Sequence, residues 1–253
     1  MRLFPLASLM LLSACTASRV ALPPPTGEEV TVFIHGYRGS FLATADGERE
    51  RAWVSVGDLL TRGERSLALP FPGQRATPGF GPLEVDGPMT RFTVLPWVAR
   101  YDIYKGFLEF ARERLPGLVV FDYDWRQDNR VTAKRLCALL DSLAQERGGR
   151  VKLNLVAHSM GGLVTLHCLR YGTGRTLAVV GVGHPLIKSF RIIDGKPTFE
   201  DPVLADGDGS VLTTRALPPA PLHVDRLETR ADHVGMMGDE EVQEAVARFV
   251  TGD

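Results

Sequence analysis

The chain has 253 residues, a formal net charge of −1, and ordinary contents of hydrophobic (44%) and charged (23%) residues. This length and composition suit one domain with a sizeable core and exclude a repeat protein or a largely disordered chain. Basic residues are scattered rather than grouped, so nucleic acid is not expected as a partner or substrate.

The first 29 residues are predicted to lie outside the folded domain. Arg2 precedes an apolar run that is too short to span a bilayer as a permanent helix. Leu12-Ser13-Ala14-Cys15 then resembles a bacterial lipobox, which makes residues 1–14 a lipoprotein signal peptide and Cys15 the lipidated residue. A plain secretory signal is the alternative. Residues 15–29 contain three consecutive prolines and are interpreted as a linker. The expected location is the bacterial cell envelope, on the outer membrane through lipidated Cys15.

The domain is predicted to span residues 30–253 and to begin with a strand at Val30–Ile34. The strand runs into His35-Gly36-Tyr37-Arg38-Gly39-Ser40. A glycine-bounded turn at the end of a strand can present a backbone N–H to the oxyanion of an acyl-transfer reaction. Tyr37 is therefore a predicted oxyanion-hole donor, and a simple turn with a structural His35 is the alternative.

Residues 41–100 are predicted to form a lid-like insertion. Prolines and glycines interrupt this stretch after an expected helix at Trp53–Leu60. Long irregular segments in compact domains are often lids or binding loops. Five apolar side chains would give it a hydrophobic face: Phe71, Phe80, Phe92, Leu95 and Trp97. A merely structural or disordered insertion is the alternative.

Strands and helices then alternate. A helix is expected at Ile103–Leu115, a buried strand at Leu118–Phe121 and an amphipathic helix at Val131–Glu146. The acids and arginine of Asp122–Arg126 are interpreted as an ion pair that fixes a loop rather than as catalytic groups. This alternation predicts an α/β fold with a mostly parallel central sheet and helices on both faces.

The most informative stretch is Val151–Gly162, where an apolar strand runs into a helix through Ser159. Ala157 and Gly161 stand two residues either side of this serine, which fits a nucleophile elbow with alanine in the first glycine position. Ser159 is the predicted nucleophile, and the N–H of Met160 is the second predicted oxyanion donor. An ordinary serine in a turn is the alternative.

Two cysteines remain besides Cys15. Cys137 and Cys168 both lie on the apolar sides of expected helices, and they are predicted to be buried small hydrophobes rather than a disulfide or a metal site. A further strand is expected at Thr176–Val182, and His184 just after it is predicted to stabilise a turn or to face the substrate rather than to act as a base. Phe190–Phe199 reads as a hairpin.

The acid and the base are expected late in the chain. Asp208 is preferred to Asp206 because two small residues follow it, and His233 is the predicted base. A serine hydroxyl needs an imidazole to remove its proton, and a carboxylate must orient that imidazole and stabilise its cation. A solvated loop histidine is the alternative for His233. A final helix is expected at Asp239–Phe249.

Three motifs together resemble the lecithin:cholesterol acyltransferase-like branch of the α/β-hydrolases. They are Ala157-His158-Ser159-Met160-Gly161-Gly162, Tyr123-Asp124-Trp125-Arg126 and Gly207-Asp208-Gly209-Ser210-Val211, followed by the late His233. The resemblance implies an α/β-hydrolase fold and a Ser159–Asp208–His233 triad without a metal, acting on acyl esters of lipids.

A lipase, esterase or phospholipase is thus the expected function. Transfer to a lipid alcohol is the alternative, but the chain is shorter than the eukaryotic acyltransferases, and His35-Gly36 stands where they carry Pro-Gly. A non-catalytic lipid- or partner-binding lipoprotein is the alternative from another class. No cofactor or metal is implied, because the sequence has no P-loop, dinucleotide fingerprint or clustered metal ligands. The oligomeric state is left open.

Overall fold

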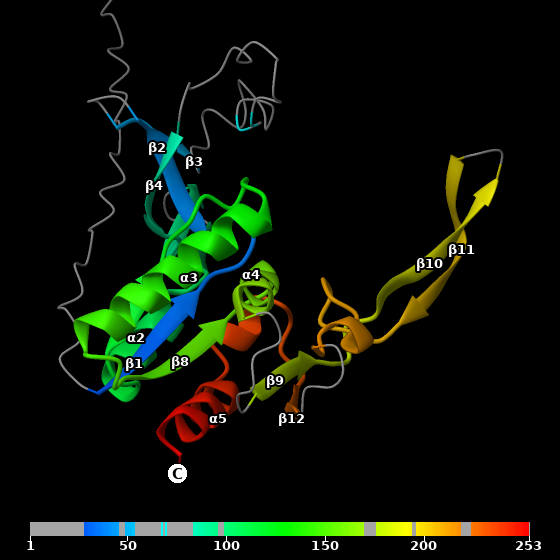
Figure 1. Ribbon diagram of the computed structural model, residues 1–253. Helices are drawn as coiled ribbons and strands as arrows, with labels where there is room; N and C mark the ends of the chain where they lie inside the picture. Colours follow the sequence, from blue (N-terminus) through cyan, green and yellow to red (C-terminus); the bar gives the residue numbers. More distant parts are fainter. Residues whose placement is uncertain are drawn as a thin grey trace, which may run out of the picture.

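The computed structural model describes residues 28–45, 49–53, 67, 69, 83–95, 99–169, 176–193, 196–218 and 224–252 (Figure 1). The predicted signal peptide, Cys15 and nearly all of the predicted linker lie outside the described residues. So do Phe71, Phe80 and Trp97 of the predicted lid. Within the described ranges, no helix is both long and apolar enough to cross a membrane.

Twelve strands and four α-helices are described. In chain order they are β1 (Glu29–Ile34), β2 (Ser40–Thr44), β3 (Arg51–Trp53), β4 (Leu83–Pro88), β5 (Arg91–Leu95), β6 (Ala99–Asp102), α2 (Lys105–Arg114), β7 (Leu118–Phe121), α3 (Asn129–Glu146), β8 (Lys152–Ala157), α4 (Met160–Leu169), β9 (Thr176–Gly181), β10 (Leu186–Ile193), β11 (Lys196–Ala205), β12 (Val224–Thr229) and α5 (Glu240–Thr251). Two short 3-10 helices lie at Thr213–Arg215 and Gly235–Met237.

Most elements predicted outside residues 41–100 are confirmed within one or two residues. The strand predicted at Leu118–Phe121 is β7, and the predicted amphipathic helix is α3, which Asp128 caps by accepting a hydrogen bond from the N–H of Arg130. The predicted hairpin is present as the antiparallel pair β10–β11. Hydrophobic periodicity locates such elements well, because each helix or strand has its own buried face and shows the pattern independently of the others.

The predicted fold class is wrong. The described strands form five small sheets rather than one central, mostly parallel sheet with helices on both faces, and three of the five are antiparallel. The largest parallel sheet has only three strands, in the order β7-β1-β8, and β9 pairs with β12 in a separate parallel sheet. The β10–β11 hairpin extends away from the rest of the molecule (Figure 1). Alternating strands and helices therefore did not produce a continuous sheet.

The predicted insertion is also more regular than expected. Strands β3, β2 and β4 form an antiparallel sheet, and β5 pairs with β6. Every residue of β2 is buried, so this strand lacks the alternation that marks a half-exposed strand. Trp53 ends β3 instead of beginning a helix, and residues 54–60 lie outside the described part of the chain.

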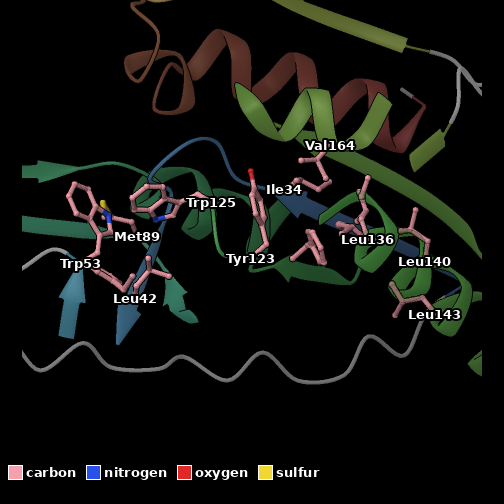
Figure 2. Close-up of a cluster of buried hydrophobic side chains, with 14 of the residues drawn as sticks. Ile34, Leu42, Trp53, Met89, Tyr123, Trp125, Leu136, Leu140, Leu143 and Val164 are labelled. Atoms are coloured by element: carbon pink, nitrogen blue, oxygen red, sulfur yellow. The ribbon is translucent and has the colours of Figure 1, made fainter. Parts of the chain in front are cut away.

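Side chains of β1 alternate between two hydrophobic clusters, as the period of a strand requires. Val32 and Ile34 join a cluster with buried residues of α3 and with Val164 of α4. Figure 2 shows this cluster running from Leu143 past Tyr123 to Trp53. Phe33 belongs to the second cluster, which contains buried residues of α2 and α5. Burial of both sets fixes β1 in the middle of the molecule.

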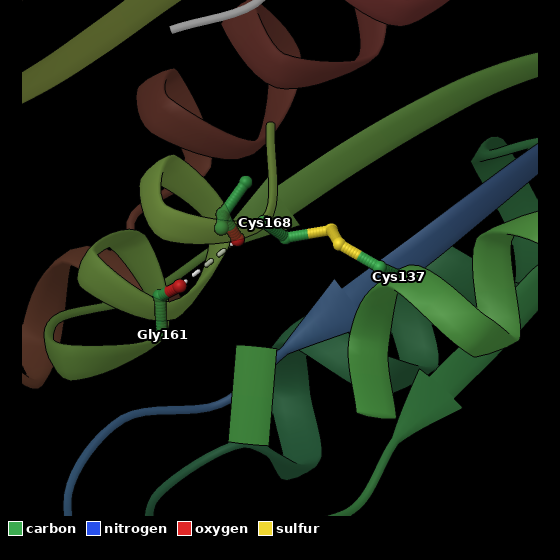
Figure 3. The surroundings of a disulfide bond; sticks show 4 residues. Cys137, Gly161 and Cys168 are labelled. Carbon is green, nitrogen blue, oxygen red and sulfur yellow. Dashed lines mark hydrogen bonds between the residues drawn. A yellow bond between two sulfur atoms is a disulfide. The ribbon is translucent and has the colours of Figure 1, made fainter. Parts of the chain in front are cut away.

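A disulfide joins α3 to α4. Cys137 and Cys168 are bonded, with their Cα atoms 5.6 Å apart (Figure 3). The prediction of two unpaired buried cysteines is therefore wrong. Helical periodicity placed both on apolar sides, but it could not show that the two helices pack against each other and bring those sides together.

Removal of this disulfide should lower the free energy of unfolding by about 2–4 kcal/mol, because the bond closes a loop of 31 residues in the unfolded chain. Urea denaturation of the Cys137→Ala/Cys168→Ala variant against the oxidised parent measures the difference. The parent in excess reductant is the matched control and should unfold at a similarly reduced urea concentration. Equal midpoints for all three samples would contradict the bond's stabilising role.

Candidate active site

Ser159 lies in a sharp turn between β8 and α4. Its φ angle is 55°, in the left-handed region that non-glycine residues seldom adopt. Small neighbours make the turn possible: a Cβ on Gly161 would lie 2.5 Å from the carbonyl oxygens of Ile34 and His35, and a Cβ on Gly36 would lie 2.7 Å from Cβ of Ser159. The geometry is that of a nucleophile elbow, as the sequence predicted.

The structure brings the three predicted catalytic side chains together. The Ser159 hydroxyl donates a hydrogen bond to Nε2 of His233 at 2.9 Å. On the other side of the same ring, Nδ1–H donates to Oδ2 of Asp208 at 2.7 Å. An ionised carboxylate can only accept hydrogen bonds, so Nδ1 of His233 carries the proton and Nε2 is the acceptor. This tautomer leaves Nε2 free to accept the serine proton.

Asp208 is held by its own loop. Its Oδ1 accepts hydrogen bonds from the backbone N–H groups of Ser210 (2.8 Å) and Val211 (2.6 Å). Burial acts to raise the pKa of Asp208, but the hydrogen bonds from His233, Val211 and Ser210 outweigh it and lower the pKa. The carboxylate therefore stays ionised beside the imidazole.

Asp206, the rival acid, lies elsewhere. Its Oδ1 accepts a hydrogen bond from the N–H of Gly183 at 2.7 Å, which fixes the turn after β9. His184 also has the predicted turn-stabilising role, since its Nε2–H donates to the carbonyl of Arg230 at 2.7 Å. Its backbone forms a bridge with Asp208. Both residues thus position the loop that carries the acid.

The two residues with predicted oxyanion donors lie near Ser159: Met160 follows it in the chain, and Tyr37 lines the same cavity. Met160 is the first residue of α4, and the first N–H groups of a helix have no partner within the helix. Tyr37 follows Gly36 at the end of β1, and its ring packs edge-on against Trp125, with ring centroids 5.1 Å apart. The role of these N–H groups in binding an oxyanion stays a prediction.

A buried pair that the sequence reasoning did not single out supports this site. His158 Nε2–H donates to the backbone carbonyl of His233 at 2.7 Å, and its Nδ1 accepts from the hydroxyl of Tyr104 at 2.8 Å. The Tyr104 oxygen in turn accepts the N–H of Gly36 at 2.9 Å. The chain of bonds links the β1 turn, the elbow and the base. His158 adjoins Ser159 in the sequence, but nothing in the sequence connects it to Tyr104.

His35 is equally buried and stacks on Tyr123, with ring centroids 4.1 Å apart. Its Nδ1–H donates to the carbonyl of Gly36 at 2.9 Å. Burial lowers the pKa of His35 to about 4 and that of His158 to about 4, and the electrostatic interaction of His158 with the neighbouring His233 adds to the effect at His158. Both imidazoles are therefore neutral at pH 7.

The Asp122–Arg126 segment contains the predicted structural ion pair. Asp124 is buried and Arg126 is partly buried, and they lie 2.6 Å apart, Oδ2 to Nη2. The guanidinium of Arg126 also donates to the carbonyl of Leu67 at 3.2 Å. Burial acts to raise the pKa of Asp124, but the hydrogen bonds and charge of Arg126 lower it overall. This pair ties the loop after β7 to the segment around Leu67.

A cavity of about 530 Å³ opens over the serine. It is lined by residues from the β1 turn, from the predicted insertion and from the loops that carry the acid and the base: Tyr37, Arg38, Trp53, Met89, Ile103, Tyr104, His158, Ser159, Ser210, Val211, His233 and Val234. Trp53 and Met89 show that the predicted insertion contributes to its wall. Across the part of the chain that the structure describes, no group of three or more histidine, cysteine or acidic side chains could hold a metal ion.

The left-handed backbone at Ser159 leads to a stability prediction. The Ser159→Gly and Ser159→Ala variants both lack the hydroxyl, but only alanine keeps a Cβ at φ 55°. Ser159→Gly should therefore be more stable than Ser159→Ala by about 1 kcal/mol. Chemical denaturation of the two variants measures the difference, and an alanine variant as stable as the glycine variant would show that this backbone is unstrained.

The buried histidines lead to a pH prediction. An unfolded histidine binds a proton near pH 6.5, whereas folded His158 and His35 bind one only near pH 4. The unfolded state therefore binds more protons in this window, and stability should fall as pH falls from about 6.5 to 4, by about 3 kcal/mol for each histidine. His158→Asn removes one group that takes up a proton on unfolding. It should therefore reduce the slope of the free energy of unfolding against pH by the contribution of one proton. An unchanged slope in denaturation curves between pH 7 and 4.5 would contradict the assignment.

Comparison with known proteins does not assign the chain to a family. No family model matches the sequence. The chain is 28% identical over 161 residues to "Uncharacterized protein YJR098C" of Saccharomyces cerevisiae (strain ATCC 204508 / S288c), a match covering 61% of this chain and 23% of the yeast protein. The chain thus matches less than a quarter of the length of that relative. The resemblance to the lecithin:cholesterol acyltransferase-like branch stays a prediction.

Proposed function

We propose that this protein is a serine hydrolase that cleaves carboxylic esters of lipid acyl chains through an acyl-enzyme on Ser159. The observation that carries the proposal is the continuous hydrogen-bond chain from Ser159 through His233 to Asp208, at 2.9 and 2.7 Å. It combines a nucleophile, a base and an orienting carboxylate in the geometry that acyl transfer requires. Ser159 and His233 also line an open cavity, so a substrate can approach the serine.

The first half of the proposed reaction acylates the enzyme. Oγ of Ser159 attacks the ester carbonyl carbon while Nε2 of His233 takes the hydroxyl proton. The imidazolium that results is stabilised by Asp208, whose lowered pKa keeps it ionised. The tetrahedral intermediate then collapses, the C–O bond to the alcohol breaks, and His233 returns the proton to the leaving alkoxide.

The second half releases the acid. His233 takes a proton from water, and the hydroxide oxygen attacks the acyl carbon. Collapse of the second intermediate breaks the bond to Oγ and returns the proton to Ser159. In both halves the negative oxygen is expected to accept hydrogen bonds from the N–H groups of Met160 and Tyr37.

The cavity wall favours an apolar acyl group. Trp53, Met89, Ile103, Val211 and Val234 supply hydrophobic surface around the serine. An acyl chain placed there would be removed from water, which favours binding by about 0.8 kcal/mol for each methylene buried. This lining supports lipid esters over small polar esters as substrates.

We also propose that the protein works in the cell envelope, attached to a membrane through lipidated Cys15. The disulfide between Cys137 and Cys168 supports a location outside the reducing cytosol, because such bonds persist mainly in oxidising compartments.

An active-site phosphonate tests the proposed nucleophile. A fluorophosphonate probe should label the parent on Ser159, and Ser159→Ala should lose both labelling and at least about 10⁴-fold in kcat/KM toward a 4-nitrophenyl acyl ester. Peptide mapping of the labelled protein identifies the modified residue. Equal ester hydrolysis by the parent and Ser159→Ala would falsify the proposal.

Paired aspartate variants serve as the matched control. Asp208→Asn should lower kcat by about 10⁴-fold, since the amide can no longer hold the Nδ1–H tautomer of His233. Asp206→Asn should cost less than about tenfold, because Asp206 contacts Gly183 rather than the imidazole.

A further inference from the structure

We infer that Tyr104 and His158 are positioning residues of the proposed hydrolase. Through one buried line of hydrogen bonds, from Gly36 through Tyr104 and His158 to His233, they hold the predicted oxyanion turn and the base in place. This line is called the bridge below. The inference rests on the proposed function and adds two residues to the same site. It predicts that loss of the Tyr104 hydroxyl lowers kcat rather than substrate binding.

The direction of each hydrogen bond in the bridge is fixed. The carbonyl of His233 can only accept, so Nε2 of His158 carries a proton and donates at 2.7 Å. His158 is buried and neutral, so its Nδ1 has no proton and accepts from the Tyr104 hydroxyl at 2.8 Å. The Tyr104 oxygen accepts the N–H of Gly36 at 2.9 Å. Burial raises the pKa of Tyr104 to about 12, so the hydroxyl keeps the proton that it donates.

Helix capping does not explain a tyrosine at position 104. Tyr104 is the N-cap residue of α2, where serine, threonine, asparagine and aspartate are preferred, but its side chain makes no capping hydrogen bond. Its buried ring instead makes T-shaped contacts with Phe33 of β1 and with His158, with ring centroids 5.1 and 5.6 Å apart. This packing holds the hydroxyl between the turn after β1 and the residue that precedes Ser159.

The turn after β1 is in close contact with the nucleophile. A Cβ on Gly36 would lie 2.7 Å from Cβ of Ser159 and 3.2 Å from Nδ1 of His158. Gly36 immediately precedes Tyr37, whose N–H is a predicted oxyanion donor. The bond from Gly36 to Tyr104 therefore helps to set where that donor lies relative to the serine. A displacement of about 1 Å among such groups can lower a rate by about a hundredfold.

The other end of the bridge reaches the proposed base. The ring of His158 packs beside the ring of His233, with centroids 4.8 Å apart, in addition to its bond to the His233 carbonyl. His233 becomes an imidazolium in the proposed reaction, and a neutral His158 places no repelling charge beside it. The bridge thus constrains two groups that act on the reacting atoms from opposite sides of Ser159 in the sequence.

Tyr104→Phe tests the bridge. The variant keeps the ring that packs on Phe33, but it leaves two buried groups without a partner, the N–H of Gly36 and Nδ1 of His158. The turn and the imidazole should therefore shift. Steady-state hydrolysis of 4-nitrophenyl hexanoate should show kcat lowered by about tenfold to hundredfold and KM within about threefold of the parent's.

Tyr123→Phe is the matched control. The Tyr123 hydroxyl is also buried and donates to a backbone carbonyl, that of His35, at 2.7 Å, but this bond does not lead to His158 or His233. The control should lose stability in urea denaturation as Tyr104→Phe does, yet keep kcat within about threefold of the parent's. Parental kcat in Tyr104→Phe, or an equal loss of kcat in Tyr123→Phe, overturns the inference.

Two variants of His158 test the end of the bridge at the base. His158→Gln places an amide N–H near the position of Nε2 and can still donate to the carbonyl of His233, whereas the side chain of His158→Asn is too short to do so. The glutamine variant should therefore keep a higher kcat than the asparagine variant. Parental kcat in His158→Asn would overturn the role of His158.

Amide hydrogen exchange separates this inference from the proposed hydrolysis. In a Ser159→Ala background, Tyr104→Phe should speed exchange in the peptides that contain Gly36 and His233, and Tyr123→Phe should leave the His233 peptide unchanged. The N–H of His233 donates to the carbonyl of Asp208, so its exchange reports a shift passed along the bridge. Failure of phosphonate labelling in the parent with this exchange pattern intact rejects the hydrolase alone. Normal labelling of the parent, with parental kcat and exchange in Tyr104→Phe, rejects the positioning role alone.

Discussion

The close approach between the end of β1 and the elbow after β8 is the constraint on which the rest of the site depends. β1 and β8 are parallel neighbours, in a register that pairs Ile34 with Ala157. Both chains therefore leave the sheet at the same edge, where the turn after β1 meets Ser159. This close approach requires glycine at positions 36 and 161, because a side chain at either position would overlap the backbone or Ser159. The cavity and the placement of the predicted oxyanion donors both follow from it.

His233, the proposed base, is fixed by its backbone as well as by its side chain. The N–H of His233 donates to the carbonyl of Asp208 at 2.9 Å, and its own carbonyl accepts the Nε2–H of His158 at 2.7 Å. The loops that carry Asp208 and His233 are thus tied to each other and to the residue that precedes Ser159. Burial keeps His158 neutral, and a neutral ring can accept from Tyr104 while donating to His233. The burial that keeps His158 in place beside His233 also makes the stability of this region sensitive to acid.

Sequence reasoning succeeded where the information is local and failed where it depends on pairing. The elbow around Ser159 and the strand at Leu118–Phe121 are encoded in consecutive residues, and the choice of Asp208 over Asp206 depended on the two small residues that follow it. Which strands share a sheet is decided by side chains far apart in the chain, so the continuous parallel sheet was wrongly predicted. The Cys137–Cys168 disulfide and the Tyr104–His158 hydrogen bond span 31 and 54 residues, and no spacing rule signals either contact.

Backbone strain is concentrated at the candidate site, and the surrounding structure holds the strained residues in place. Of the three described non-glycine residues with positive φ, Arg38 and Ser159 both line the cavity. Each such conformation costs about 1–3 kcal/mol, against a net stability of about 5–15 kcal/mol for a typical domain. The surrounding structure must therefore stabilise both turns by more than this cost. β1 does so from within two hydrophobic clusters, and the disulfide attaches α4, which begins directly after Ser159, to α3. Glycine at position 159 would relieve strain and remove the proposed nucleophile, so stability and the proposed chemistry are in conflict at this residue.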